Sequence, residues 1–105
     1  FLFVMDEVKP PATLMCDACA RDDLPTVKSL LEEDKGLLQC MDPSGYTPLH
    51  WTALYNCTQC AEFLLDCGAD ALAKGAHGDT PLHWATAISS EPCLDLILRH
   101  LLEKY

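Results

Sequence analysis

The sequence has few basic residues for its length. Seven Lys and Arg stand against sixteen Asp and Glu in 105 residues, so the formal net charge is −9. A surface that neutralises phosphates needs an excess of Lys and Arg, so this balance argues against binding to nucleic acid and against docking on anionic lipid. It favours a protein partner that presents a basic peptide or a basic surface, and the alternative is that the acidic residues only keep the protein soluble.

Aromatic residues and long apolar runs are also scarce. Aromatic side chains make up 8% of the chain, although hydrophobic residues make up 50%, so we expect a single domain with an aliphatic core rich in small residues. No apolar run reaches the roughly 18 to 20 residues that a membrane span needs. The apolar opening, Phe1–Met5, is too short for a signal sequence and lacks a basic start.

Arrangements typical of catalysis are missing too. The sequence shows no Ser–His–acid spacing, no Gly-rich phosphate loop and no paired catalytic carboxylates. The acidic runs Asp22–Asp23 and Glu32–Asp34 are typical of solvated faces and helix caps. We therefore predict that the protein is not an enzyme.

Cysteine, by contrast, is abundant, with seven residues. The number is odd and a helical core needs no disulfides, so we expect reduced thiols and an intracellular location, cytoplasmic or nuclear. The pairs Cys16-x-x-Cys19 and Cys57-x-x-Cys60 have the spacing of zinc ligands, but no Gly-rich turn accompanies either pair. A zinc site is therefore a remote alternative, as is a redox dithiol within either pair, and we predict no cofactor.

One stretch, Gly45–Trp51, recurs 33 residues later at Gly78–Trp84, and its last five letters, Thr-Pro-Leu-His-Trp, are unchanged. Repetition at this length indicates a stacked array, in which no unit can bury its apolar face alone. The period and the Thr-Pro-Leu-His core resemble those of the ankyrin repeat family. The resemblance implies an all-α fold, an ankyrin-repeat solenoid of stacked helix-turn-helix units joined by β-turn or hairpin-like loops.

The 33-residue frame divides the chain into four parts. We expect an extended lead-in or tail at 1–11, an N-terminal capping repeat at 12–44, a second repeat at 45–77 and a third at 78–105. In the first unit the frame puts Leu14–Asp17 where the others have Thr-Pro-Leu-His. The third unit lacks a Gly-Ala-Asp terminator, so either its last helix covers the end of the stack or the repeat array is truncated. Because that helix is rich in leucine, we also expect copies of the chain to associate through it.

The resemblance implies structural roles for the recurring residues. Thr47 and Thr80 are expected to cap the helices that begin at the prolines after them. The resemblance also implies that His50 and His83 form hydrogen bonds across their turns, and that these bonds connect neighbouring connectors. Because the two histidines are equivalent in the repeat, we interpret them as structural rather than catalytic.

In ankyrin arrays, partners usually bind the protruding turns and the exposed side of the first helices. Carried over position by position, the resemblance implies partner contacts at Ser44, Tyr46, Leu54, Tyr55, Ala76, His77, Asp79 and Ile88. An apolar strip flanked by tyrosine is typical of an interface core, but packing between repeats is an alternative for Leu54 and Ile88. We expect Trp51 and Trp84 mainly in packing.

Three hypotheses for function follow. The leading one is a non-catalytic protein-interaction module that binds a partner through its loop tips and the concave face of its first helices. The second is a targeting or regulatory segment of a larger enzyme or channel. The remote third is a zinc-stabilised structural protein.

Overall fold

The computed structural model describes residues 10–88 and 91–104, and in this part of the chain every regular element is helical. The elements are α1 (Pro11–Ala20), α2 (Leu24–Glu33), the 3₁₀-helix η1 (Lys35–Gln39), α3 (Pro48–Tyr55), α4 (Thr58–Asp66), α5 (Pro81–Ala87) and α6 (Glu91–Lys104). The predicted all-α class is thus confirmed. Most of the expected lead-in lies outside the described residues, and α1 already begins at the last residue of that range, Pro11.

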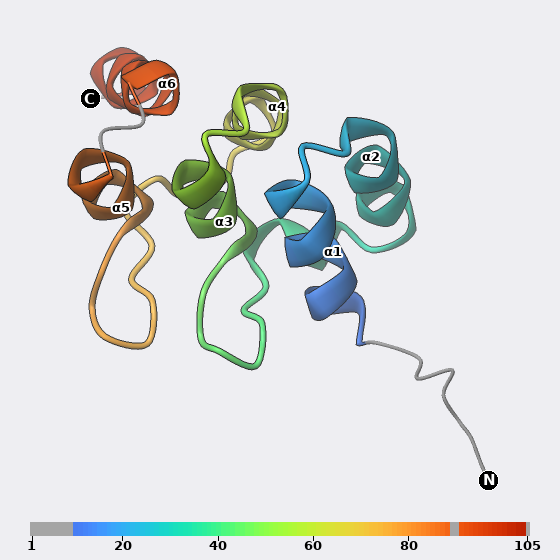
Figure 1. The fold of residues 1–105 in the computed structure, drawn as a ribbon. Coiled ribbons are helices and arrows are strands. Elements are labelled where there is room, and N and C mark those ends of the chain that lie inside the picture. The colour runs from blue at the N-terminus through green and yellow to red at the C-terminus, as the bar shows by residue number, and fades with distance from the viewer. Residues whose placement is uncertain (1–9, 89–90, 105) are drawn as a thin grey trace, which may run out of the picture.

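The helices form two layers (Figure 1). Helices α1, α3 and α5 lie side by side in one layer, and α2, α4 and α6 lie in the other. The connectors that lead into α3 and α5 project as loops on the same side of the stack (Figure 1). Each unit is therefore a helix pair that packs on its neighbour, as the resemblance implied.

Prolines mark where α3 and α5 begin, and residues with a left-handed backbone conformation follow the ends of α3 and α4. Pro48 and Pro81 occupy the first turns of α3 and α5, where the missing N–H would have no helical partner. Asn56 follows α3 with a φ of 56°, and Gly68 follows α4 with a φ of 101°. Both residue types tolerate this left-handed region, so the chain can reverse direction there.

The core is aliphatic and rich in small residues, as predicted. Its large members are Met15, Leu49, Leu64 and Ile97, each at most 1% exposed. Alanine and cysteine at buried positions of the facing helices let their backbones approach closely: Ala18, Cys19, Ala53, Cys60, Ala85 and Cys93. In this core, cysteine acts as a small hydrophobic residue.

The first unit departs from the 33-residue frame by one residue. The amide of Asp23 donates to the Ala18 carbonyl and the amide of Cys57 donates to the Thr52 carbonyl, both at 2.9 Å. The two bonds are equivalent in the repeat. Along the sequence, however, Asp23 and Cys57 are separated by one residue more than the 33-residue frame predicts. The additional residue lies between α2 and the connector, where the first unit contains η1.

This shift changes which residues correspond. Asp22 and Asn56 share a φ of 56°, so Asp22 is the equivalent of Asn56. The frame placed Asp17 at the position of His50 and was wrong there, because in the structural register Cys16 takes that position. The first unit therefore has a thiol where the second has an imidazole.

In the second unit, Thr47 and His50 form a capping box. The Thr47 amide donates to His50 Nδ1 at 3.2 Å, so the hydrogen of the neutral ring is on Nε2, which donates to the Asp79 carbonyl of the next connector at 2.7 Å. Burial, the largest influence, lowers the pKa of His50 and keeps the ring neutral. Thr80 and His83 form the same capping box, but His83 is exposed at the end of the stack.

Candidate protein-binding face

The ends of α3 and α5 carry the exposed apolar edge of the inner helix layer. Tyr55 is 57% exposed and Ile88 is 43% exposed, whereas Leu54 is half-buried. Leu54 and Ile88 line an apolar hollow of about 210 Å³ together with Trp84 and Ala87. The two aliphatic residues thus meet at one accessible hollow between neighbouring units.

A larger groove runs between α1, α3 and the first connector. Its volume is about 590 Å³, and its lining includes Asp17, Arg21, Asp42, Ser44, Trp51 and Tyr55. We call it the acidic groove, because two of its charged side chains are carboxylates and one is a guanidinium. Among the predicted contact residues, it brings Ser44 and Tyr55 together.

Aromatic rings connect the acidic groove to the apolar hollow. Trp51 stacks on Tyr55 with ring centroids 6.3 Å apart and meets Trp84 edge-on at 6.1 Å. The centre of the Tyr46 ring lies 4.5 Å from that of Trp84 and 6.4 Å from that of Trp51. We call Tyr46, Trp51, Tyr55 and Trp84 the aromatic strip. Both tryptophans are half-buried against the core, so each packs and also lines a hollow.

Asp42 fixes the strip from the first connector. Its carboxylate accepts a hydrogen bond from Trp51 Nε1 and another from the Tyr46 amide, both at 3.0 Å. Hydrogen bonds to a charged acceptor are stronger than those between neutral groups. The indole of Trp51 is therefore held in place before any partner binds.

The two connectors pack on each other through glycine. A Cβ at Gly75 would lie 2.6 Å from a ring carbon of Tyr46, and a Cβ at Gly45 would lie 2.6 Å from the Cβ of Ala76. Glycine at 75 is therefore required by the Tyr46 ring, although Asp42 takes the equivalent place in the first connector. The contrast between Gly75 and Asp42 was the sequence signal that could have revealed this contact.

The remaining predicted contact residues divide into two groups. Ala76 and His77 are exposed at the tip of the second connector and line neither the acidic groove nor the apolar hollow. Tyr46 and Asp79 are half-buried, with the Tyr46 ring inside the aromatic strip and the Asp79 carbonyl bonded to His50. The structure thus places Tyr46 at the centre of the face and gives Asp79 a role in joining units.

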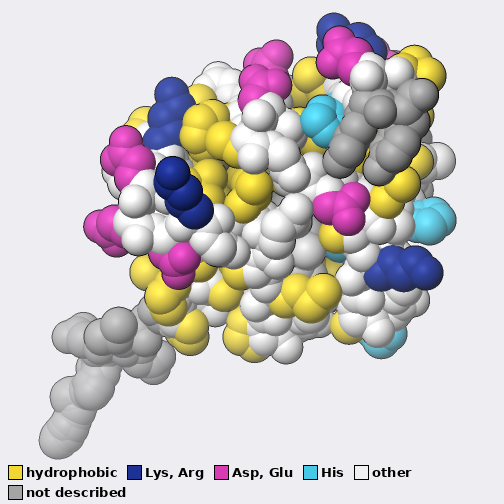
Figure 2. All heavy atoms as spheres, turned by 180° about the vertical axis from the view of Figure 1, so that it is seen from behind, with side chains coloured by type: hydrophobic (Ala, Val, Ile, Leu, Met, Phe, Trp, Pro, Cys, Tyr) yellow, Lys and Arg dark blue, Asp and Glu magenta, His cyan; other side chains and the backbone are white. Residues whose placement is uncertain are grey.

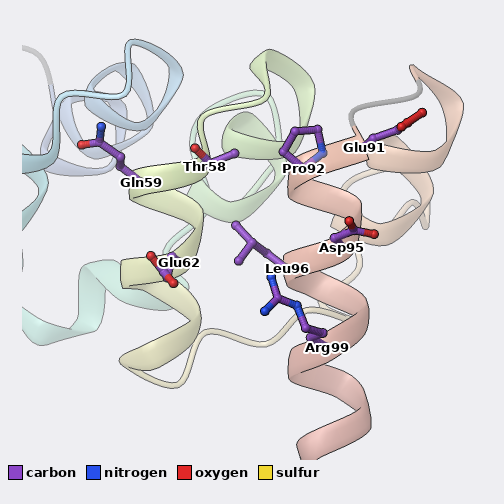
Figure 3. A pocket seen from close by; sticks show the side chains of 8 residues that line it. All are labelled: Thr58, Gln59, Glu62, Glu91, Pro92, Asp95, Leu96 and Arg99. Carbon is purple, nitrogen blue, oxygen red and sulfur yellow. The ribbon is translucent and has the colours of Figure 1, made fainter.

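The outer helix layer carries two further hollows. The first, of about 600 Å³, lies between α4 and α6, where Leu96 and Arg99 reach from α6 toward α4 (Figure 3). The second, of about 430 Å³, lies between α2 and α4, where Lys28 Nζ is 5.5 Å from the centre of the Phe63 ring. Seen from behind, basic side chains stand beside a hydrophobic area (Figure 2). Neither hollow contains a residue of the predicted binding set.

All seven cysteines are free. Within residues 10–88 and 91–104, no three His, Cys, Asp or Glu side chains form a group that could hold a metal ion. In the same ranges no helix has both the length and the apolar character of a membrane span.

Comparison with protein families gives a match to a model of ankyrin repeats in three copies, over residues 14–104. The chain belongs to the ankyrin repeat family. Ankyrin repeats are non-catalytic modules that mediate protein–protein interaction, which agrees with the face described above.

Curated relatives of this ankyrin repeat chain include palmitoyltransferases. The chain is 43% identical over 53 residues to palmitoyltransferase akr1 of Aspergillus oryzae, which covers 50% of the chain and 7% of that protein. It is 40% identical over 53 residues to the protein of the same name from Emericella nidulans, again 50% and 7% of the two lengths. With that of Schizosaccharomyces pombe it is 40% identical over 58 residues, 55% of the chain and 9% of the relative. The match thus spans less than a tenth of each relative.

Proposed function

We propose that this ankyrin domain binds an extended basic segment of a partner protein along the acidic groove, the aromatic strip and the apolar hollow. The observation that carries the proposal is the exposed Tyr55 in the same groove as the carboxylates Asp17 and Asp42. The exposed Ile88 lines the apolar hollow that the aromatic strip joins to this groove. Aromatic anchors surrounded by polar groups are characteristic of binding hot spots.

The charges of the groove favour a lysine or arginine side chain. Asp17 and Asp42 provide the attraction, and the Tyr55 ring offers a face for a cation. The formal net charge of −9 adds long-range steering toward a basic segment, most strongly at low salt. An apolar side chain of the same segment would fill the hollow between Leu54 and Ile88.

The face is also prepared for binding. Asp42 holds the indole of Trp51, and Tyr46 is packed against Gly75 in the next connector. A partner therefore has few side chains of this domain to order when it binds, which lowers the entropic penalty of association. This favours recognition by a preformed surface rather than by folding on contact.

A peptide array that varies charge and apolar content tests the proposal. We expect the domain to retain peptides in which Lys or Arg is followed by an apolar residue, with weaker retention as salt rises. Tyr55→Ala should lower affinity about tenfold or more, since a hot-spot side chain contributes roughly 1.4 kcal/mol or more.

A matched control uses Leu72, which is 44% exposed and does not line either binding hollow. Leu72→Ala should leave peptide retention unchanged, and neither variant should shift the unfolding midpoint appreciably, because both are exposed side chains outside the core. Equal retention by wild type and Tyr55→Ala would contradict this placement of the binding face.

We also propose that the domain serves as a targeting or regulatory segment of a larger protein, with any catalysis carried out elsewhere in it. The relatives named palmitoyltransferase akr1 support this, because the matching stretch is a small share of each of them. Determining the full reading frame around this sequence is the test. A frame without a further domain would contradict the proposal.

Two smaller proposals complete the functional assignment. We place the domain inside the cell, in the cytoplasm or nucleus, supported by its seven free thiols, and microscopy of a tagged chain checks this. We also propose self-association through α6, supported by Leu98 and Leu102, which are 41% and 79% exposed. Leu102→Glu should then lower the mass measured by light scattering at high concentration, and a strict monomer of the wild type would contradict self-association.

A further inference from the structure

The hollow of about 430 Å³ between α2 and α4 combines an apolar floor with a basic rim, and we call it the outer groove. Leu31 on its floor belongs to the core, and Leu38 and Phe63 pack against that core. Lys28 and Lys35 line the same groove and are exposed. The outer groove therefore offers apolar surface with two ammonium groups at its edge.

The outer groove is formed where the first two units meet. Lys28 comes from α2 and Lys35 from η1, whereas Phe63 comes from α4. Lys28 Nζ is 5.5 Å from the centre of the Phe63 ring, within the range of a cation–π contact, which places the ammonium group over the groove. The Asp34 carboxylate accepts a hydrogen bond from the Gly36 amide at 2.9 Å and so caps η1. Both lysines are thus carried by elements that are ordered before a partner binds.

The repeat position of Lys28 has the opposite charge in the other units. In the register given by the equivalent bonds of Asp23 and Cys57, Lys28 corresponds to Glu62 on α4. One repeat later the same position is Asp95 on α6. Packing of the helix pairs therefore does not require a cation at this position, so Lys28 is a feature of the first unit alone.

The hollow of about 600 Å³ between α4 and α6 occupies the equivalent place at the second joint, and its charge is reversed. Its lining has one basic residue, Arg99, against the three carboxylates Glu62, Glu91 and Asp95 (Figure 3). The lining of the outer groove has two lysines against one carboxylate, Glu32. The two joints therefore present outer surfaces of opposite sign to a partner.

We propose that the outer groove binds an amphipathic helix of a partner protein, in which Asp or Glu flanks the apolar face. Apolar side chains of that helix pack on Leu38 and Phe63, and its carboxylates lie against Lys28 and Lys35. A groove between two helices is a common site for an amphipathic helix. The outer groove lies in the outer helix layer, so this site is separate from the face that carries Tyr55.

The formal net charge of −9 opposes an acidic partner at long range. Repulsion between exposed charges is screened beyond a Debye length of about 8 Å at physiological salt. Carboxylates that touch Lys28 and Lys35 lie well within that length. The sign of the charges in the outer groove, rather than the net charge of the chain, therefore determines which helix it accepts.

Cys67 reports directly on occupancy of the outer groove. It lines the groove and is exposed, whereas the other six thiols are buried or half-buried. Limited reaction of the full chain with N-ethylmaleimide should therefore modify Cys67 first, and a helix bound in the groove should slow that reaction. Mass spectrometry of proteolytic peptides measures the rate at Cys67.

The probe is a synthetic helical peptide that has leucine along one face and glutamate beside it. The matched peptide has lysine in place of each glutamate. We expect the glutamate peptide to slow the alkylation of Cys67 and the lysine peptide to leave the rate unchanged, because Lys28 and Lys35 repel it.

Charge reversal at an exposed position tests the role of the rim. Lys28→Glu gives the first unit the residue that the second has at this position, and it should weaken the glutamate peptide about tenfold and allow the lysine peptide to protect Cys67. Lys74→Glu changes an exposed lysine outside the outer groove and should alter neither result. Tyr55→Ala should also leave protection unchanged, which separates this site from the basic-segment site.

Equal protection by the two peptides, no protection by the glutamate peptide, or protection that persists in Lys28→Glu would overturn the proposal. Two further outcomes would assign the outer groove to a different occupant and overturn it as well. Protection by phosphatidylserine vesicles but not by the glutamate peptide would indicate a membrane. Protection that rises with protein concentration in the absence of peptide would indicate a second copy of the chain.

Discussion

The stack has two joints between units, and they use different chemistry at the same position. At the second joint the His50 imidazole donates to the Asp79 carbonyl at 2.7 Å while its other nitrogen accepts from Thr47. At the first joint Cys16 takes the place of His50, and its sulfur lies 3.9 Å from the Tyr46 carbonyl. The second joint is thus a short two-sided bridge, and the first is one long, weak contact.

The first joint has other support. The Asp22 carboxylate accepts from the Cys60 amide in the first turn of α4 at 3.1 Å, and the Cys57 thiol lies 3.4 Å from the Ala20 carbonyl. The second joint has an equivalent cap, in which the Cys93 amide donates to Asn56 Oδ1 at 3.4 Å, so the two joints differ at the His50 position rather than in this cap.

The largest expected effect is that of His50→Ala. The substitution leaves the Thr47 amide and the Asp79 carbonyl without this partner and opens space in a fully buried site, so we expect a loss of about 3 kcal/mol in the free energy of unfolding. Urea unfolding followed by circular dichroism measures it. A loss below about 1 kcal/mol would show that the histidine bridge does not hold the second joint.

Cys16→Ala should have a smaller effect, about 1 kcal/mol, because it removes one buried sulfur and a long contact. The same urea experiment makes the comparison direct. If Cys16→Ala proved as destabilising as His50→Ala, the two joints would be energetically alike and the contrast between them would be lost.

The pH dependence of stability isolates the buried imidazole. Burial lowers the pKa of His50 below its ordinary 6.5, so as the pH falls through 6.5 the unfolded chain binds a proton that the folded chain does not. The contribution of His50 is therefore complete above 6.5 and lost between 6.5 and its lower folded pKa. His50→Gln, which can keep the capping box, should show a smaller fall in stability between about pH 7.5 and about pH 5.5. Parallel pH profiles would contradict this.

The smallest effect is expected for His83→Ala, although His83 stands in the same five-letter motif as His50. Its ring is exposed, so water can take the place of the capping contact to Thr80, and we expect a loss of about 0.5 kcal/mol. A loss equal to that of His50→Ala would mean that the motif stabilises its own turn rather than the joint.

Much of the fold could be predicted from local signals. The recurring Thr-Pro-Leu-His-Trp letters indicated the repeat, and Pro48 and Pro81 indicated where α3 and α5 begin. The one-residue shift of the first unit could not be predicted, because that unit lacks the motif and η1 takes up the additional residue without a distinct signature. The frame therefore put Asp17, rather than Cys16, at the position of His50.

The binding face was less predictable than the fold. Tyr55 and Ile88 could be placed on an exposed helix edge, because position in the repeat determines which side of a helix faces out. The contact of Tyr46 with Gly75 and the hydrogen bond from Trp51 to Asp42 could not, since each depends on how a loop approaches another element.

The sequence by itself determined that this chain is an ankyrin stack of three units with a small-residue core, because repeat period, helix starts and apolar spacing are all local properties. Only the tertiary structure decided what the side chain at one repeat position does in each unit. His50 bridges two units, His83 caps its own helix at the exposed end of the stack, and the Cys16 thiol contacts the Tyr46 carbonyl. The physical reason is that a side chain's role depends on the unit stacked against it. That neighbour supplies the carbonyl and the burial.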